Sequence, residues 1–187
     1  MLPYPILPLE KAKWKGTPLP IAYTTNTYYN ITVDRTETGF QMNMVLTDTS
    51  SSPITHTAEE YDFPDKLYED YRPDSRAFGM MDDDGNLIAA IEFEPEEWSN
   101  RLRVHELWIS DRYHRMGIGR ALMDLAKEEA RRAGNRMLIL ETQSCNTNAI
   151  GFYLHEGFTL IGFDTCCYAN NDLARREVRI ELGWEVH

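Results

Sequence analysis

The stretch Leu102-Arg-Val-His-Glu-Leu-Trp-Ile-Ser-Asp-Arg-Tyr-His-Arg-Met-Gly-Ile-Gly-Arg120 decides the fold of this chain. Its first half, with Val104, Trp108 and Ile109, predicts a strand. Its second half contains Gly117 and Gly119, which allow a tight turn and the close approach of a ligand to the backbone. From Gly117 onward apolar residues recur at helical spacing, and the glycine after this run is a typical helix end. The stretch therefore predicts a strand, a glycine-containing loop and a helix.

The start of this predicted helix is suited to binding an anion. The first N–H groups of a helix have no partner within the helix and carry partial positive charge. A glycine-containing loop at that point can hold a phosphate or pyrophosphate, and Arg115 and Arg120 add positive charge. An ordinary strand–helix turn that uses glycine for its geometry alone is an equally good interpretation. The loop has neither of the common nucleotide-binding glycine patterns.

Two segments resemble the GNAT acetyltransferase superfamily. His114-Arg-Met-Gly-Ile-Gly119 resembles its Arg/Gln-x-x-Gly-x-Gly/Ala signature, with His114 in place of the usual Arg or Gln. Asn146-Thr-Asn-Ala-Ile-Gly-Phe-Tyr-Leu-His-Glu-Gly-Phe158 resembles its Asn-x-x-Ala-x-x-Phe-Tyr…Gly-Phe segment. The resemblance implies an α/β (α+β) fold with a mixed, mostly antiparallel central sheet flanked by helices. Leu138 to Gln143 and Asp164 to Asn170 look most like the streptothricin acetyltransferase branch.

The resemblance also implies acetyl-CoA as co-substrate, without a metal, and it assigns residues to that ligand. The pyrophosphate would meet the loop residues Arg115, Met116, Gly117, Ile118, Gly119 and Arg120. The pantetheine arm would pair like an extra strand with Trp108, Ile109 and Ser110, and would also contact Asn146. Tyr153 would contact the cofactor and act as general acid, because a phenol stays protonated at neutral pH and can donate to a departing sulfur. A Tyr at helical spacing is more often a core residue, so this role depends on the family position.

The remaining site residues follow less directly. His105 and Glu106 are candidates for the base that takes the amine proton, and strand alternation places them on opposite faces unless a bulge intervenes. One of them in the site and the other in a structural hydrogen bond is the simpler interpretation. Asp164, Trp98 and Tyr168 are candidates for binding a cationic amine through a carboxylate and aromatic faces. Asp164 could equally cap a turn.

Composition limits the function. The chain has 187 residues and a net charge of −11, which argues against nucleic acid as a partner and suits a cationic substrate. The N-terminus is a poor signal peptide and no apolar run reaches 18 residues, so we expect a cytoplasmic protein without a membrane partner. The three cysteines give neither a disulfide framework nor zinc spacing, and none has an obvious paired histidine.

The rest of the chain predicts one domain over residues 21–187 behind a proline-rich arm at 1–20. The arm is expected to be ordered only if it docks on the body or on a second subunit of a homodimer. Strands are predicted at 21–34, 39–48, 75–81, 87–94, 136–142, 158–168 and 175–184, a loop at 47–57 and a helix at 146–156. The Glu-, Asp- and Tyr-rich segment Ala58–Tyr71 is interpreted as a solvated connector or as part of a wall that recognises a cation.

We expect an acetyl-CoA-dependent N-acetyltransferase acting on a primary amine of a small cationic substrate, of streptothricin type or another. A protein acetyltransferase for lysine or an N-terminus is the second hypothesis. A non-catalytic acyl-CoA-binding module is the third, and loss of Tyr153 and of any base would favour it.

Overall fold

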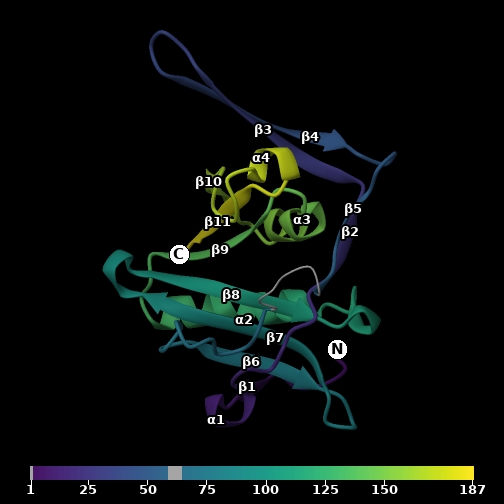
Figure 1. Ribbon diagram of the computed structural model, residues 1–187. Coiled ribbons are helices and arrows are strands. Elements are labelled where there is room, and N and C mark those ends of the chain that lie inside the picture. Colours follow the sequence, from purple (N-terminus) through teal and green to yellow (C-terminus); the bar gives the residue numbers. More distant parts are fainter. Residues whose placement is uncertain (1, 59–64) are drawn as a thin grey trace. The chain divides into compact units, whose positions relative to one another are not determined.

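The computed structural model describes residues 2–58 and 65–187 (Figure 1). Part of the predicted acidic connector, residues 59–64, lies outside the described residues. The contacts divide the chain into two compact units, each built from separate stretches. Unit 1 comprises Met1–Ile21, Thr57–Leu140 and Gly183–His187, and unit 2 comprises Ala22–His56 and Glu141–Leu182. We describe each unit by itself, and the prediction of a single domain over 21–187 stays a prediction.

Unit 1 is organised around a mixed sheet with the strand order β1-β6-β7-β8-β9. Neighbouring strands are antiparallel except β8 and β9, which are parallel. The predicted strand, loop and helix at its centre are β8, a 3₁₀ turn with the glycine loop, and α2 (Figure 1). The elements are β1 (Leu7–Leu9), α1 (Lys11–Trp14), β6 (Arg76–Met81), β7 (Leu87–Glu96), η2 (Glu97–Ser99), β8 (Arg101–Ile109), η3 (Asp111–Tyr113), α2 (Ile118–Arg132) and β9 (Met137–Gln143).

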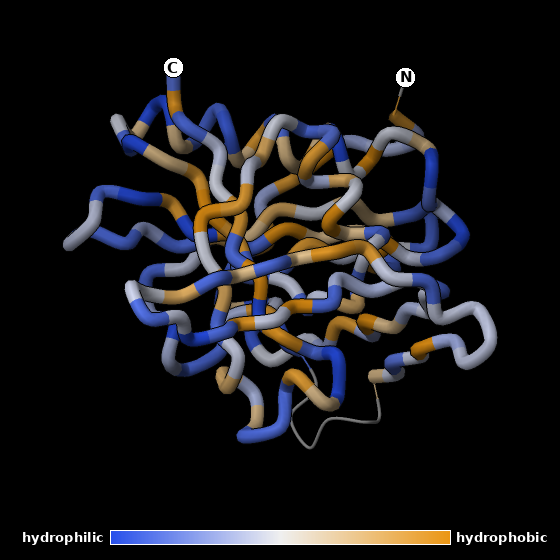
Figure 2. Tube along the Cα trace, turned by 90° about the horizontal axis from the view of Figure 1, so that it is seen from above, coloured by the Kyte–Doolittle hydropathy of each residue, from blue (hydrophilic) through white to orange (hydrophobic). Residues whose placement is uncertain are grey.

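The core of unit 1 lies between this sheet and α2. Every residue of β7 from Ile88 to Phe93 is buried, as expected for a central strand covered on both faces. Helix α2 buries an apolar stripe at helical spacing together with Lys127, and leaves charged residues such as Asp124 and Glu128 exposed. Figure 2 shows hydrophobic stretches that alternate with hydrophilic ones along the chain. None of the helices in the described part of the chain is long and apolar enough to cross a membrane.

The proline-rich arm docks on unit 1. Leu7–Leu9 pair with Ala77–Gly79 at the edge of the sheet, and Leu9 and Leu19 are almost fully buried. The Tyr68 hydroxyl donates to the Leu9 carbonyl and accepts from the Ala77 N–H at 3.0 Å. The first of the two predicted locations for the arm, on the body of its own chain, is therefore the one observed.

The pairing of β8 changes at His105. Glu92 of β7 faces Glu106, whereas Phe93 faces Val104, so His105 is the extra residue of a β-bulge. On the other side of β8, the pairing with β9 covers Arg101 to Val104 and ends there within the described residues. From Glu106 to Ile109, β8 pairs with β7, and the described residues provide no β9 partner at these positions.

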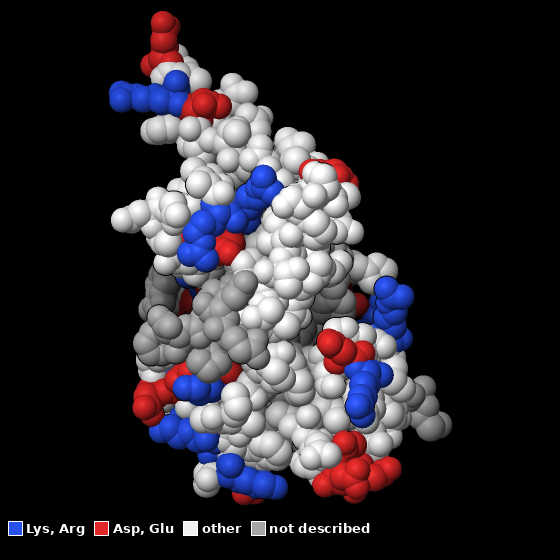
Figure 3. All heavy atoms as spheres, turned by 45° about the vertical axis from the view of Figure 1, so that its right-hand side comes forward, with Lys and Arg blue, Asp and Glu red and all other residues white. Residues whose placement is uncertain are grey.

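Unit 2 contains two two-stranded sheets, helices α3 and α4, and strand β10, which neighbours β11. Its β3–β4 hairpin is amphipathic, because Ile31 faces Met44 and Val33 faces Met42, while Thr32 faces Asn43 on the other side. Figure 3 shows acidic and basic side chains at the tip of this hairpin and mostly uncharged ones below it. The elements are β2 (Tyr23–Thr25), β3 (Thr27–Arg35), β4 (Phe40–Asp48), β5 (Ile54–His56), α3 (Thr147–His155), β10 (Thr159–Asp164), α4 (Asp172–Arg175) and β11 (Arg179–Glu185).

Four boundary predictions were wrong in unit 2. The single strand expected at 21–34 is two strands, β2 and β3, which pair with β5 and β4 respectively. The loop expected at 47–57 contains β5, which pairs with β2, because Ile54 and His56 find partners that are distant in sequence. The strand expected at 158–168 ends at Asp164, whose carboxylate accepts from the Cys166 N–H at 2.9 Å and starts a turn. The strand expected from 175 begins at Arg179, because the preceding residues form α4.

Candidate functional site

The glycine loop has the geometry of an anion site. Gly117 has φ +80°, a left-handed conformation that favours glycine, and α2 begins at the next residue. The first helical hydrogen bond runs from the Ala121 N–H to the Gly117 carbonyl, so the N–H groups of Ile118 and Gly119 precede it. Among the described residues, no side chain caps this end of α2, and a Cβ at Gly117 would meet no atom within 4 Å. Uncapped N–H groups at the start of a helix are typical of an anion site.

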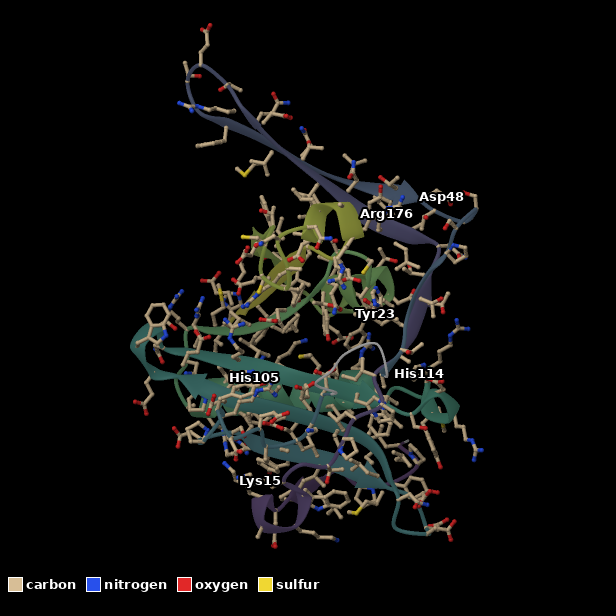
Figure 4. All side chains as sticks on the ribbon, in the orientation of Figure 1. Lys15, Tyr23, Asp48, His105, His114 and Arg176 are labelled. Atoms are coloured by element: carbon tan, nitrogen blue, oxygen red, sulfur yellow. The ribbon has the colours of Figure 1, made fainter. Side chains whose placement is uncertain are left out.

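His114, where the family signature usually has Arg or Gln, ties the loop to the end of β8. Its Nε2 lies 2.8 Å from the Ile109 carbonyl oxygen and 3.8 Å from an Asp111 carboxylate oxygen. Figure 4 shows His114 in the segment that follows β8 and His105 along the strand itself. The imidazole therefore has a local structural partner. An anion site made of the loop's N–H groups would not depend on the replaced side chain.

The end of β8 offers a free backbone edge. Trp108 and Ile109 lie beyond the last β8–β9 pair, and both are half-buried. The Ser110 N–H donates to the Ile88 carbonyl at 2.8 Å, on the β7 side. An extended ligand arm could thus hydrogen-bond the β9-facing side of β8, next to the loop.

The two base candidates have opposite electrostatic environments. The His105 ring lies 3.5 Å from Glu94, but burial and the positive charges of Arg72 and Arg103 lower its pKa to about 3. Burial raises the pKa of Glu106 to about 8, with a further contribution from the negative charge of Asp65. At neutral pH His105 is therefore neutral and a very weak base, whereas Glu106 titrates near the working range of an enzyme.

Sequence reasoning missed the partners of Glu106. Arg72 Nη1 lies 2.7 Å from Glu106 Oε1 and 4.0 Å from Glu92 Oε1. Glu92 has no exposed surface, and its other oxygen accepts from the Tyr68 N–H at 2.8 Å. Glu92 could have been noticed in the sequence, because an acidic residue inside the apolar run 87–93 is uncommon. Arg72 gave none, because it comes from a loop that only the tertiary fold brings to β8.

Asn146 and Tyr153 lie in unit 2 on helix α3. Asn146 is the N-cap, and its Oδ1 accepts from the Ala149 N–H at 3.2 Å, so only its NH₂ group would be offered to a pantetheine arm. Tyr153 is 8% exposed, and its ring packs at 5.4 Å from Phe152 and 6.0 Å from Phe158. Its ring is thus a core element of unit 2.

The predicted substrate residues are scattered. Asp164 caps the turn after β10, which is the structural role considered for it, and Tyr168 is 41% exposed two residues beyond that turn. Trp98 is 85% exposed in η2 and stacks on the Arg101 guanidinium, 5.5 Å from the ring centroid. It stands before the first residue of β8, roughly 15–20 Å along the strand from Glu106 at about 3.3 Å per residue.

Unit 2 also brings a histidine to a cysteine, which the sequence did not suggest. The Cys145 Sγ lies 3.6 Å from His56 Nε2, and the same nitrogen lies 3.2 Å from Glu177 Oε1. Burial raises the pKa of the Cys145 thiol, so it stays protonated and is a poor nucleophile. Within the part of the chain that the structure describes, no group of three His, Cys, Asp or Glu side chains could hold a metal ion.

Comparison with known proteins agrees with the loop and the fold. The sequence profile of the acetyltransferase (GNAT) family matches residues 43–158. Streptothricin acetyltransferase of Streptomyces lavendulae is 31% identical over 147 residues, which cover 79% of this chain and 76% of that protein. A crystal structure of nourseothricin acetyltransferase is 30% identical, with a TM-score of 0.72 over 98% of this chain and 99% of that one. A candidate streptothricin acetyltransferase from Bacillus anthracis str. Ames, solved with acetyl coenzyme A, shares the fold at 19% identity, with a TM-score of 0.72 over 100% of this chain and 99% of that one. The profile match over more than half of the chain, together with the long match to the Streptomyces protein, shows that the chain belongs to the acetyltransferase (GNAT) family and is an N-acetyltransferase.

Proposed function

We propose that the chain transfers the acetyl group of acetyl-CoA to a primary amine of a small cationic substrate, of the streptothricin type. The names of its relatives support this substrate class. The observation that carries the proposal is Glu106, a buried carboxyl group with a raised pKa on β8, close in sequence to the glycine loop. A base with a pKa near the working pH is what amine deprotonation requires.

The cofactor would bind mainly through the backbone. The loop from Arg115 to Arg120, including Met116, Gly117, Ile118 and Gly119, would hold the pyrophosphate, since the first N–H groups of α2 have no partner within the helix and no described side chain caps them. Trp108, Ile109 and Ser110 would line the pantetheine arm along the free edge of β8, and Asn146 would donate to it from its NH₂ group. When bound, acetyl-CoA supplies the thioester that the amine attacks.

Glu106 would act as the base, directly or through a water molecule. Its carboxylate takes one proton from the substrate ammonium and becomes a carboxylic acid, which leaves a neutral amine with a free electron pair. His105 would not compete, because its lowered pKa makes it about as basic as an ordinary carboxylate. The deprotonated form of Glu106 is the active one, so kcat/KM should rise with pH up to about 8.

Tyr153 would be the general acid. Its hydroxyl would donate a proton to the sulfur that leaves when the tetrahedral adduct collapses to the amide. Asp164 and Tyr168 would contact the cationic substrate, aided by the net charge of −11. Trp98 has the least support for such a role, because it stands at the other end of β8.

The biological setting follows as part of the proposal. We place the enzyme in the cytoplasm, without a nucleic-acid or membrane partner and without a metal. A homodimer is compatible with the docked arm, since only Leu7–Leu9 of the arm pair with the sheet. Sedimentation of the purified protein measures its oligomeric state directly.

The test is free thiol release from acetyl-CoA against a panel of amines: streptothricin, spermidine, lysine, an aminoglycoside and a lysine peptide. Selective turnover of streptothricin supports the proposal. Turnover of the lysine peptide alone would replace it by protein acetylation. Absence of turnover in the presence of acetyl-CoA binding would favour the acyl-CoA-binding module instead.

A further inference from the structure

Two buried glutamates face each other across β7 and β8. Glu92 and Glu106 are directly opposite in the strand register, and their side chains are 0% and 5% exposed. Like charges at such positions repel each other. The Arg72 guanidinium, itself 11% exposed, lies between them, with its Nη1 2.7 Å from Glu106 and 4.0 Å from Glu92. One cation therefore serves two facing carboxyl groups.

Arg72 interacts unequally with the two glutamates, because it is hydrogen-bonded to Glu106 and not to Glu92. Glu92 Oε1 and Arg72 Nε are buried and have no hydrogen-bond partner among the described residues. Nearly all buried polar atoms in proteins are hydrogen-bonded, so an unpaired carboxylate oxygen requires an explanation. The other oxygen of Glu92 is fixed by the Tyr68 N–H at 2.8 Å. One oxygen of the Glu92 carboxylate is therefore fixed, and the other can still accept a hydrogen bond. This second oxygen, Oε1, lies about 1 Å beyond hydrogen-bond distance from Arg72 Nη1.

We propose that Glu92 is a positioning residue that receives the Arg72 guanidinium each time Glu106 becomes protonated, and returns it when Glu106 loses the proton. This inference rests on the proposed function, in which Glu106 is the base. Arg72 Nη2 donates to the Tyr71 hydroxyl at 3.1 Å, so a small rotation of the guanidinium about that contact moves Nη1 from one carboxylate to the other.

The charges and protons balance in this exchange. With both glutamates ionised, the three groups carry a net charge of −1. After Glu106 accepts a proton from the substrate ammonium, Glu92 and Arg72 form a neutral pair beside a neutral acid. Arg72 keeps its charge throughout, and no electrons move. Without Glu92, protonation of Glu106 would leave the Arg72 guanidinium without either of the two carboxylates it lies beside, which is unfavourable for a buried charge.

Among the described residues, the charges of Asp65, Arg72 and Glu92 act on Glu106. Asp65 and Arg72 approach from the segment before β6, and Glu92 from β7. Asp65 and Glu92 disfavour the ionised form of Glu106, and Arg72 favours it. Removing the charge of Glu92 should therefore lower the pKa of Glu106 and keep Arg72 on it.

The test is the pH dependence of kcat and kcat/KM for Glu92→Gln. Its amide oxygen can still accept from the Tyr68 N–H, so the fixed end of Glu92 is retained. We expect the midpoint of the rising limb of kcat/KM to move at least about one pH unit downward. The plateau of kcat should fall about tenfold because the protonated base is less favourable, while KM for acetyl-CoA stays within about twofold. The matched control is Glu129→Gln, which alters the ion pair between Glu129 of α2 and Arg76 of β6. This variant should leave the midpoint of kcat/KM unchanged.

Arg72→Lys supplies a second measurement, which also serves if Glu92→Gln fails to fold. A single ammonium lacks the fork that spans two carboxylates, so the midpoint should rise and kcat should fall. A Glu92→Gln enzyme with the wild-type midpoint and plateau, or an Arg72→Lys enzyme with the wild-type profile, would overturn the inference. Failure of the proposed function has a different signature, because Glu106→Gln would then retain wild-type turnover.

Discussion

Replacing Glu106 by Gln should change how the stability of the protein depends on pH. Glu106 has an ordinary pKa of 4.5 in the unfolded chain and about 8 in the folded one. Between these values the folded state holds one proton more than the unfolded state. The wild-type protein therefore loses stability as pH rises, with its full contribution present below pH 4.5 and exhausted above about 8. Gln does not titrate, so the variant lacks this loss.

The magnitude follows from the shift. One bound proton changes the free energy of unfolding by about 1.4 kcal/mol per pH unit. From pH 5 to 7.5 the variant should gain about 3 kcal/mol on the wild type, in addition to a constant offset from the altered contact with Arg72. Above about pH 9 both proteins ought to follow the same slope.

The assay is urea unfolding followed by tryptophan fluorescence at a series of pH values from 5 to 9.5. Glu129→Gln serves as control, because its carboxylate pairs with Arg76 at the surface of α2, and it should run parallel to the wild type. A constant stability difference between Glu106→Gln and wild type from pH 5 to 7.5 would refute the reasoning. It would mean that the ion pair with Arg72 outweighs the cost of burial and keeps Glu106 ionised.

Three further changes test the glycine loop, the proposed general acid and the docking of the N-terminal arm. Gly117→Glu should abolish acetyl-CoA binding measured by calorimetry, because a side chain strains the left-handed backbone at this position and its carboxylate repels the pyrophosphate. Gly117→Ala brings the strain alone and should weaken binding less. Tyr153→Phe should lower turnover about 10²-fold or more with little change in acetyl-CoA affinity, and unchanged turnover in the thiol assay would remove its acid role. Tyr68→Phe leaves the Leu9 carbonyl and the Ala77 N–H without their partner and should cost about 2–4 kcal/mol in urea unfolding, whereas a loss below about 0.5 kcal/mol would show that water replaces the hydroxyl.

The family and the central elements could be predicted from sequence because their signals are local. Gly117 requires a left-handed turn, and the helix that follows it shows its apolar stripe over four turns, so β8, the loop and α2 were found where they are. The resemblance to the GNAT superfamily and its mostly antiparallel sheet were confirmed by the family match and the structural neighbours. Short strands such as β5 were missed because three residues cannot show a period, and their pairing depends on distant partners.

The catalytic environment could be predicted only in part, for a physical reason. Their residue types make Glu106 and His105 candidates for the base, and ordinary pKa values favour the histidine for this role. The structure reverses that order, because the pKa of each group depends on burial and on charges from segments far away in the sequence. Arg72 lowers the pKa of His105 and pairs with the carboxylate of Glu106, and the β-bulge at His105 removes the simple alternation that would separate the two residues. The proposed choice of Glu106 as base therefore depends on the tertiary fold, because ordinary pKa values alone would favour His105.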